Sequence, residues 1–96
     1  MSHLLSLSGE QTIYQAVALH QQLADALQQH PELALELSQV SEIDCAGVQV
    51  LLWLQAAMQQ QGHPLRLYQP SQTVSSFLQL MGFDQLQACV EHGDES

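Results

Sequence analysis

Apolar and polar positions alternate in several short stretches of the chain, as they do along half-buried β-strands. Residues 3–8 alternate around Leu5 and Leu7, and residues 12–14 form a second short apolar run after Gly9. These two runs predict a strand and a hairpin-like start. Three more strands are predicted by the same kind of pattern: residues 32–38, 64–68 and 86–90.

Between these stretches the apolar spacing changes to that of helices. Residues 15–29 carry apolar side chains three or four positions apart, and Pro31 ends the pattern. Residues 46–61 form a longer apolar run that ends at Gly62 and Pro64. Pro70 and Ser71 open a third helix, which Gly82 closes. The sequence therefore predicts three helices that separate strands.

Strand, strand, helix, strand, helix, strand, helix, strand is the predicted order, which is typical of an α/β domain. The chain has 96 residues, 46% of them apolar, which is enough for one modest core. We expect a single domain over residues 1–90 and an acidic tail over residues 91–96.

The net charge of the chain disfavours some classes of binding partner. Arg66 is the only Lys or Arg against ten Asp and Glu residues, and the formal net charge is -9 at pH 7. Phosphate backbones and anionic lipids repel such a chain, so nucleic acid is disfavoured and basic protein surfaces are favoured. The sequence has no signal-peptide pattern and no run of roughly 20 apolar residues. We expect a cytoplasmic protein without membrane insertion.

Five histidines and two cysteines raise the question of a metal or catalytic site. The histidines lack the close spacing of zinc ligands, and Cys45 and Cys89 belong to no CxxC pair. Catalysis by Cys45 would need a histidine base brought near by the fold, and no Gly-rich oxyanion pattern accompanies it. We therefore expect no metal, no cofactor and no enzymatic activity.

The stretch "SEIDCAGVQVLL", residues 41–52, leads from polar residues into an apolar helix. Asp44 is placed to cap the first amides of that helix, and Gly47 to allow helix and sheet to approach closely. Cys45 has two interpretations. It is either a small residue packed at the helix start, or a reactive thiol, because helix N-termini favour the thiolate.

The helix predicted for residues 46–61 carries more apolar surface than contact with one sheet requires. At about 100° per residue, Ala46 and Trp53 lie together and border the face that includes Gln49. Trp53 is either an anchor for a partner or an ordinary core residue, and both interpretations stay open. The excess apolar surface also permits a homodimer.

The segment "ELSQVSEIDCAGVQVLL" resembles the signature of STAS domains, the anti-sigma factor antagonist fold. In that family a strand with a D/E-L-S-x-V pattern runs into D-S/T-x-G before a helix. "LSGE" and "FLQLMGFDQL" are similar to the family's opening hairpin and to its last helix and strand, so the resemblance covers nearly the whole chain. "DxAGxQxLL" with "LSGEQTIY" is most similar to stand-alone STAS proteins of bacterial chemotaxis gene clusters. The resemblance implies a mixed sheet of four to five strands with helices mainly on one face.

The resemblance also implies a bacterial, non-catalytic signalling module that docks a protein partner, such as an anti-sigma factor kinase or a chemotaxis protein. Relatives carry a phosphorylatable Ser or Thr where this chain has Cys45, and we do not expect a thiol there to be phosphorylated. Two alternatives stay open: the STAS subunit of an Mla-type phospholipid-transport ABC complex, and a regulator switched by oxidation of Cys45. The motif and the excess apolar surface of the following helix together give the expected docking residues: Asp44, Cys45, Ala46, Gly47, Gln49 and Trp53.

Overall fold

The computed structural model describes residues 3–91 as strands that alternate with helices. The three helices predicted from the sequence are confirmed to within one residue at each end. The elements are β1 (His3–Gln11), α1 (Ala16–Gln29), β2 (Leu33–Ile43), α2 (Cys45–Gln60), β3 (Arg66–Tyr68), α3 (Gln72–Met81), α4 (Asp84–Gln87) and β4 (Val90–Glu91).

The described strands form one four-stranded sheet in the order β1-β2-β3-β4, and each neighbouring pair runs parallel. One row of register partners crosses it from Leu5 through Leu35 and Leu67 to Val90. The predicted α/β class is confirmed. The predicted mixed sheet is wrong for residues 3–91. Each crossover contains a helix, which returns the chain to the end of the sheet where the previous strand began, so the next strand runs parallel to it.

The hairpin predicted at the start of the chain is wrong. β1 continues through Gly9 to Gln11. Gly9 pairs with Val40 and the next residue, Glu10, pairs with Glu42, so β2 has one extra residue at this point. Gly9 has a φ of 74°, which glycine adopts without strain, so the strand bends there and does not end. Residues 12–15 then form a turn that leads into α1.

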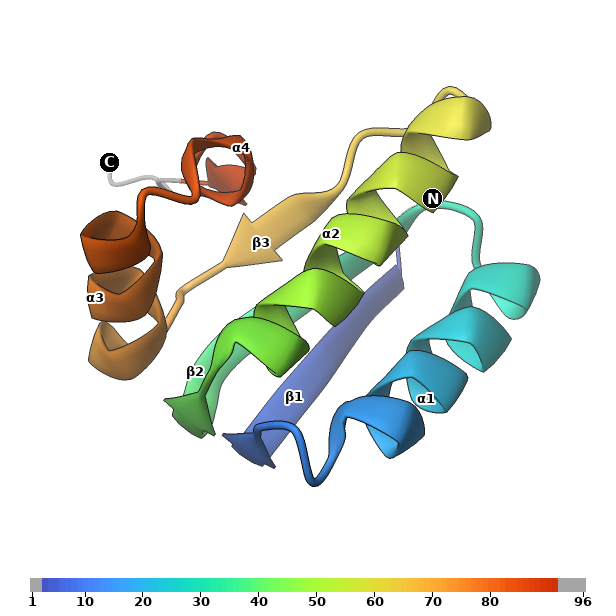
Figure 1. Cartoon of the computed structure of the whole chain (residues 1–96). Coiled ribbons are helices and arrows are strands. Elements are labelled where there is room, and N and C mark those ends of the chain that lie inside the picture. Colours follow the sequence, from blue (N-terminus) through green and yellow to red (C-terminus); the bar gives the residue numbers. More distant parts are fainter. Residues whose placement is uncertain (1–2, 92–96) are drawn as a thin grey trace.

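The helices cover one face of the sheet, as predicted. Figure 1 shows α2 lying over the sheet and running alongside β1 and β2, with α1 next to it at the β1 side and α3 near the β3 side. Leu35 and Leu67 point into this layer and are fully buried, whereas Leu4 and Arg66, on the other face, are exposed. Because the strands are parallel, the loops that leave β1 and β2 lie at the same edge of the sheet.

The last strand predicted, residues 86–90, is largely wrong. Asp84–Gln87 forms the short helix α4, and β4 is limited to Val90–Glu91. One helical turn buries Leu86 fully, as a strand would, and periodicity cannot separate the two in so short a run. The tail predicted for residues 91–96 begins at Glu91 in β4 and otherwise lies outside the described residues.

Ser71 joins the start of α3 to β2. Its hydroxyl accepts a hydrogen bond from the Val74 N–H (3.2 Å) and donates one to the Val40 carbonyl oxygen (2.8 Å). We expect Ser71→Ala to lower the free energy of unfolding in urea by about 1–2 kcal/mol. Ser76→Ala, at an exposed position of the same helix, should change it by less than about 0.5 kcal/mol. Equal effects of the two substitutions would contradict the capping role.

Candidate functional site

Asp44 lies in the turn between β2 and α2 and holds two segments with one carboxylate. Oδ1 accepts a hydrogen bond from the Gly47 N–H (3.1 Å), which confirms the predicted helix cap. Oδ2 accepts one from the Ile13 N–H (3.0 Å), in the loop between β1 and α1. The second bond was not predicted from the sequence, since 31 residues separate its partners. Asp44 therefore fixes this loop relative to the first turn of α2.

The loop between β1 and α1 is also ordered from within. The Gln15 Oε1 accepts hydrogen bonds from the Thr12 N–H (3.1 Å) and the Thr12 hydroxyl (2.7 Å), and the Gln15 N–H donates to the Thr12 carbonyl oxygen (2.9 Å). Ile13 and Tyr14 lie between these residues, and their side chains are exposed. The sequence pattern placed them in a strand and gave no signal that they form part of this site.

Gly47 allows α2 to approach the end of β1 closely, as predicted. A Cβ atom at this position would overlap the Gln11 carbonyl oxygen and would lie 3.2 Å from Cγ1 of Ile43. Gly47 is buried. It therefore sets the position of the α2 N-terminus, while Cys45 and Gln49, two positions before and after it, are exposed.

Cys45 and Gln49 are the predicted docking residues that are exposed to solvent. Cys45 is the first residue of α2, and Gln49 follows one turn later on the same side of the helix. Ala46 is half-buried beside them. Together with the β1–α1 loop, the start of α2 forms one surface at the edge where β1 and β2 end.

Trp53 contacts the protein itself. Its ring packs against the imidazole of His20 on α1, with ring centroids 4.2 Å apart, and it adjoins the core. It is half-buried. Packing between α1 and α2 accounts for these contacts, and the part of the ring that stays exposed leaves a role in partner binding as a prediction.

The second cysteine, Cys89, is buried. Its Sγ accepts a hydrogen bond from Gln55 Nε2 (3.1 Å) and donates one to the Gln85 carbonyl oxygen (3.4 Å). Burial raises the pKa of the Cys89 thiol; the Gln55 hydrogen bond opposes this rise, and the charge of Glu91 adds to it. Cys89 is therefore a protonated, structural thiol at neutral pH.

Within residues 3–91, no three His, Cys, Asp or Glu side chains are grouped so that they could hold a metal ion. His3 stacks on His30 with ring centroids 3.7 Å apart, and His63 Nδ1 lies 3.8 Å from Glu32 Oε2. These residues lie near the start of β1 and β2, at the opposite sheet edge from Cys45.

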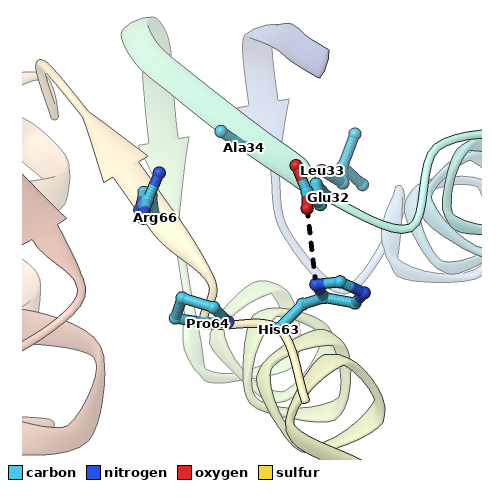
Figure 2. A pocket seen from close by; sticks show the side chains of 6 residues that line it. All are labelled: Glu32, Leu33, Ala34, His63, Pro64 and Arg66. Carbon is cyan, nitrogen blue, oxygen red and sulfur yellow. Dashed lines mark ion pairs between the residues drawn. The ribbon is translucent and has the colours of Figure 1, made fainter. Parts of the chain in front are cut away.

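Figure 2 shows a pocket at the end of the sheet where β2 and β3 begin, opposite the end that carries Cys45. His63 and Glu32 face each other there, and Arg66 lies on the strand beside them. The pocket holds about 100 Å³, below the roughly 300–1,000 Å³ of ordinary small-molecule sites. It is lined by Glu32, Leu33, Ala34, His63, Pro64 and Arg66.

Gly47 provides a direct test of the geometry at the start of α2. We expect Gly47→Ala to lower the free energy of unfolding by at least about 2 kcal/mol, because the new Cβ would displace α2 from the Gln11 carbonyl. Gln49→Ala, at an exposed position of the same helix, is the control and should be near neutral. Chemical denaturation measures both, and a Gly47→Ala protein as stable as the control would refute the close approach.

The two cysteines should differ sharply in reactivity. Titration of the folded protein with Ellman's reagent should show one fast thiol, Cys45, because Cys89 is buried and its pKa is raised. Cys45→Ser should remove the fast phase, and Cys89→Ala should leave it. Both thiols should react at similar rates in urea. Fast modification of Cys89 in the folded protein would be inconsistent with its burial.

Comparison with known proteins identifies the family to which this fold belongs. Residues 2–88 match the family model described as "Mlab, STAS domain". No curated protein matches the chain.

Solved structures of several proteins share the fold. A protein from Thermotoga maritima described as a "putative anti-sigma factor antagonist" has a TM-score of 0.77 and 22% identity, over 88% of this chain and 74% of that chain. The anti-sigma factor antagonist SpoIIAA in its unphosphorylated form has a TM-score of 0.76 and 20% identity, over 98% and 81%. A sulfate transporter family protein from Wolinella succinogenes has a TM-score of 0.72 and 20% identity, over 93% and 75%. With the family model matching most of its length, the chain belongs to the STAS domain family.

Proposed function

We propose that this chain is a regulatory module that binds a partner protein through the start of α2 and the loop beside it. STAS domains are generally non-catalytic regulatory modules, and two of the similar folds are described as anti-sigma factor antagonists. The observation that carries the proposal is the pair of exposed side chains, Cys45 and Gln49, on a helix start that Asp44 holds in place. A rigid, exposed turn of this kind reduces the entropy cost of docking.

The partner is a protein rather than nucleic acid or membrane. A net charge of -9 repels phosphate backbones and anionic lipids. None of the helices in residues 3–91 is long and apolar enough to cross a bilayer. A cytoplasmic location remains a prediction from the sequence.

Cys45 determines how the module is switched. Members of the family that this sequence resembles carry at this position a Ser or Thr that a partner kinase phosphorylates. A thiol does not replace that hydroxyl as an acceptor of phosphate. We therefore propose that docking does not depend on phosphorylation of residue 45. The exposure of Cys45 at the first position of α2 also fits the alternative of an oxidation-sensitive switch.

A subunit of an Mla-type phospholipid-transport complex is the second candidate function. The description of the matching family model names Mlab, which favours it, and the sulfate transporter neighbour fits it more loosely. Here the partner of the start of α2 would be the transport ATPase. The chemotaxis assignment rests on the sequence resemblance alone. Neighbouring genes distinguish the pathways, because a transport operon, a sigma-regulator cluster and a chemotaxis cluster differ in content.

An added charge on α2 tests the docking surface without disturbing the core. We expect Gln49→Arg to weaken binding of the cognate kinase or transport ATPase at least about ten-fold, or ~1.4 kcal/mol. The reason is that a long cation at the centre of the contact faces a basic partner. Isothermal titration calorimetry measures the affinity.

Gln79→Arg supplies the matched control. Gln79 is exposed on α3, so the same substitution there changes the net charge equally but lies away from the start of α2. It should leave the affinity within about two-fold of the original. Equal loss of affinity in the two variants would point to net charge, and unchanged affinity in both would rule out this face of α2.

A further inference from the structure

β1 forms one edge of the sheet and is paired on one side only. Within residues 3–91 its single neighbour is β2, and no described strand lies on its other side. The His3 N–H donates to the Glu32 carbonyl oxygen (2.9 Å), and the backbone groups of successive residues point to opposite sides of a strand. The N–H and C=O groups of Leu4 and Ser6 therefore point away from β2. We propose that this edge, residues 4–8 of β1, binds an extended segment of another protein as an additional strand.

The β1 edge lacks the features that usually protect an edge strand. Natural sheets protect their edges with charged residues, prolines or very short strands. The opposite edge of this sheet follows that rule, since β4 has 2 residues and ends at Glu91. Residues 3–8 of β1 contain no Asp, Glu, Lys, Arg or Pro, and Gly9 is the first residue of the strand with a positive φ. This part of β1 is therefore an extended, uncharged edge, which is the kind that accepts a further strand.

One side chain limits the length of the edge that is available. Gln11 Nε2 donates a hydrogen bond to the Ser8 carbonyl oxygen (2.9 Å). A carbonyl oxygen has two lone pairs, so this oxygen can still accept a bond from an added strand. The side chains of Leu4, Ser6 and Ser8 are exposed, which leaves the face beside these backbone groups open to solvent. The site therefore runs from Leu4 to Ser8.

The side chains beside the edge indicate the composition of the segment. Leu5 points into the helix layer but is only half-buried, whereas Leu35 and Leu67, its neighbours in the same row, are 0% exposed. Figure 1 shows α1 on the side of β1 away from β2, so α1 would cover an added strand on this face. Alternate side chains of the segment should therefore be apolar, because they would complete the burial of Leu5. On the other face the segment would contact Leu4, which is 53% exposed.

Other occupants fit this edge less well. A bilayer or a nucleic acid offers no row of alternating N–H and C=O groups. A second copy of the chain would pair its own β1 antiparallel to this one across a two-fold axis, with the helices of both copies on the same face. Each α1 extends past its own β1, into the space that the helices of the other copy would need. A loop or terminus of another protein, extended and without helices packed on it, avoids this overlap.

The test uses two synthetic peptides of equal length and charge. One alternates Val and Thr, the other has Pro in place of each Thr, and both end in Lys pairs for solubility. Each is titrated into the ¹⁵N-labelled full chain and followed by NMR. We expect the Val/Thr peptide to shift the amides of residues 4–8. It should also slow hydrogen exchange of the Leu4 and Ser6 amides at least about ten-fold, because they become hydrogen-bonded. The Val/Pro peptide should leave them unchanged, since proline cannot donate to a ladder.

Two substitutions of Ser6 separate strand addition from other modes of binding. Ser6→Pro removes the outward N–H and leaves the hydrogen bonds to β2, whereas Ser6→Ala keeps that N–H. We expect Ser6→Pro to bind the Val/Thr peptide at least about ten-fold more weakly than Ser6→Ala does. Shifts centred outside residues 4–8, equal effects of the two peptides on the original chain, or equal affinities of the two variants would each overturn the inference. The inference goes beyond the proposed function, which Gln49→Arg tests separately.

Discussion

The double hydrogen bond of the Asp44 carboxylate is the interaction on which the rest of the site depends. One oxygen binds the amide of Gly47 in the first turn of α2, and the other binds the amide of Ile13 in the neighbouring loop. Because Gly47 has no Cβ, the helix comes close enough to the end of β1 for one side chain to reach both segments. A parallel sheet places these two segments at the same edge, and Asp44 fixes their relative position.

The charged side chains of the described strands are distributed unevenly between the two ends of the sheet. The described strands carry a carboxylate pair, Glu10 and Glu42, where β1 and β2 end, and Arg66 near the other edge. The net charge of -9 attracts basic surfaces and repels acidic ones.

The helices could be predicted from the sequence because their signals are local. Apolar spacing, the Ser71 cap and the closing Gly82 all lie within a few residues of the elements that they define. The parallel sheet could not be predicted from the same patterns, since strand direction depends on how distant segments pair. The STAS resemblance anticipated a mixed sheet, and Leu86, which one turn of helix buries, was placed in a strand.

The candidate site was predicted in part. The Asp44 cap and the close approach at Gly47 follow from residue types at a helix start, and both are confirmed. The exposure of Tyr14 was hidden, because the position of its loop is set by a hydrogen bond between residues far apart in sequence. Trp53 was ambiguous for a similar reason: contact with His20 depends on the packing of two helices, which the sequence of one helix does not contain.

Hydrogen–deuterium exchange of the chain, alone and with its cognate partner, tests the central claim most directly. The claim is that the partner docks on the edge that Asp44 organises. It predicts slower exchange on binding for amides of residues 12–17 and 45–49, with little change along α3. Protection centred on α3, or on the exposed face of the sheet around Leu4 and Arg66, would contradict the account.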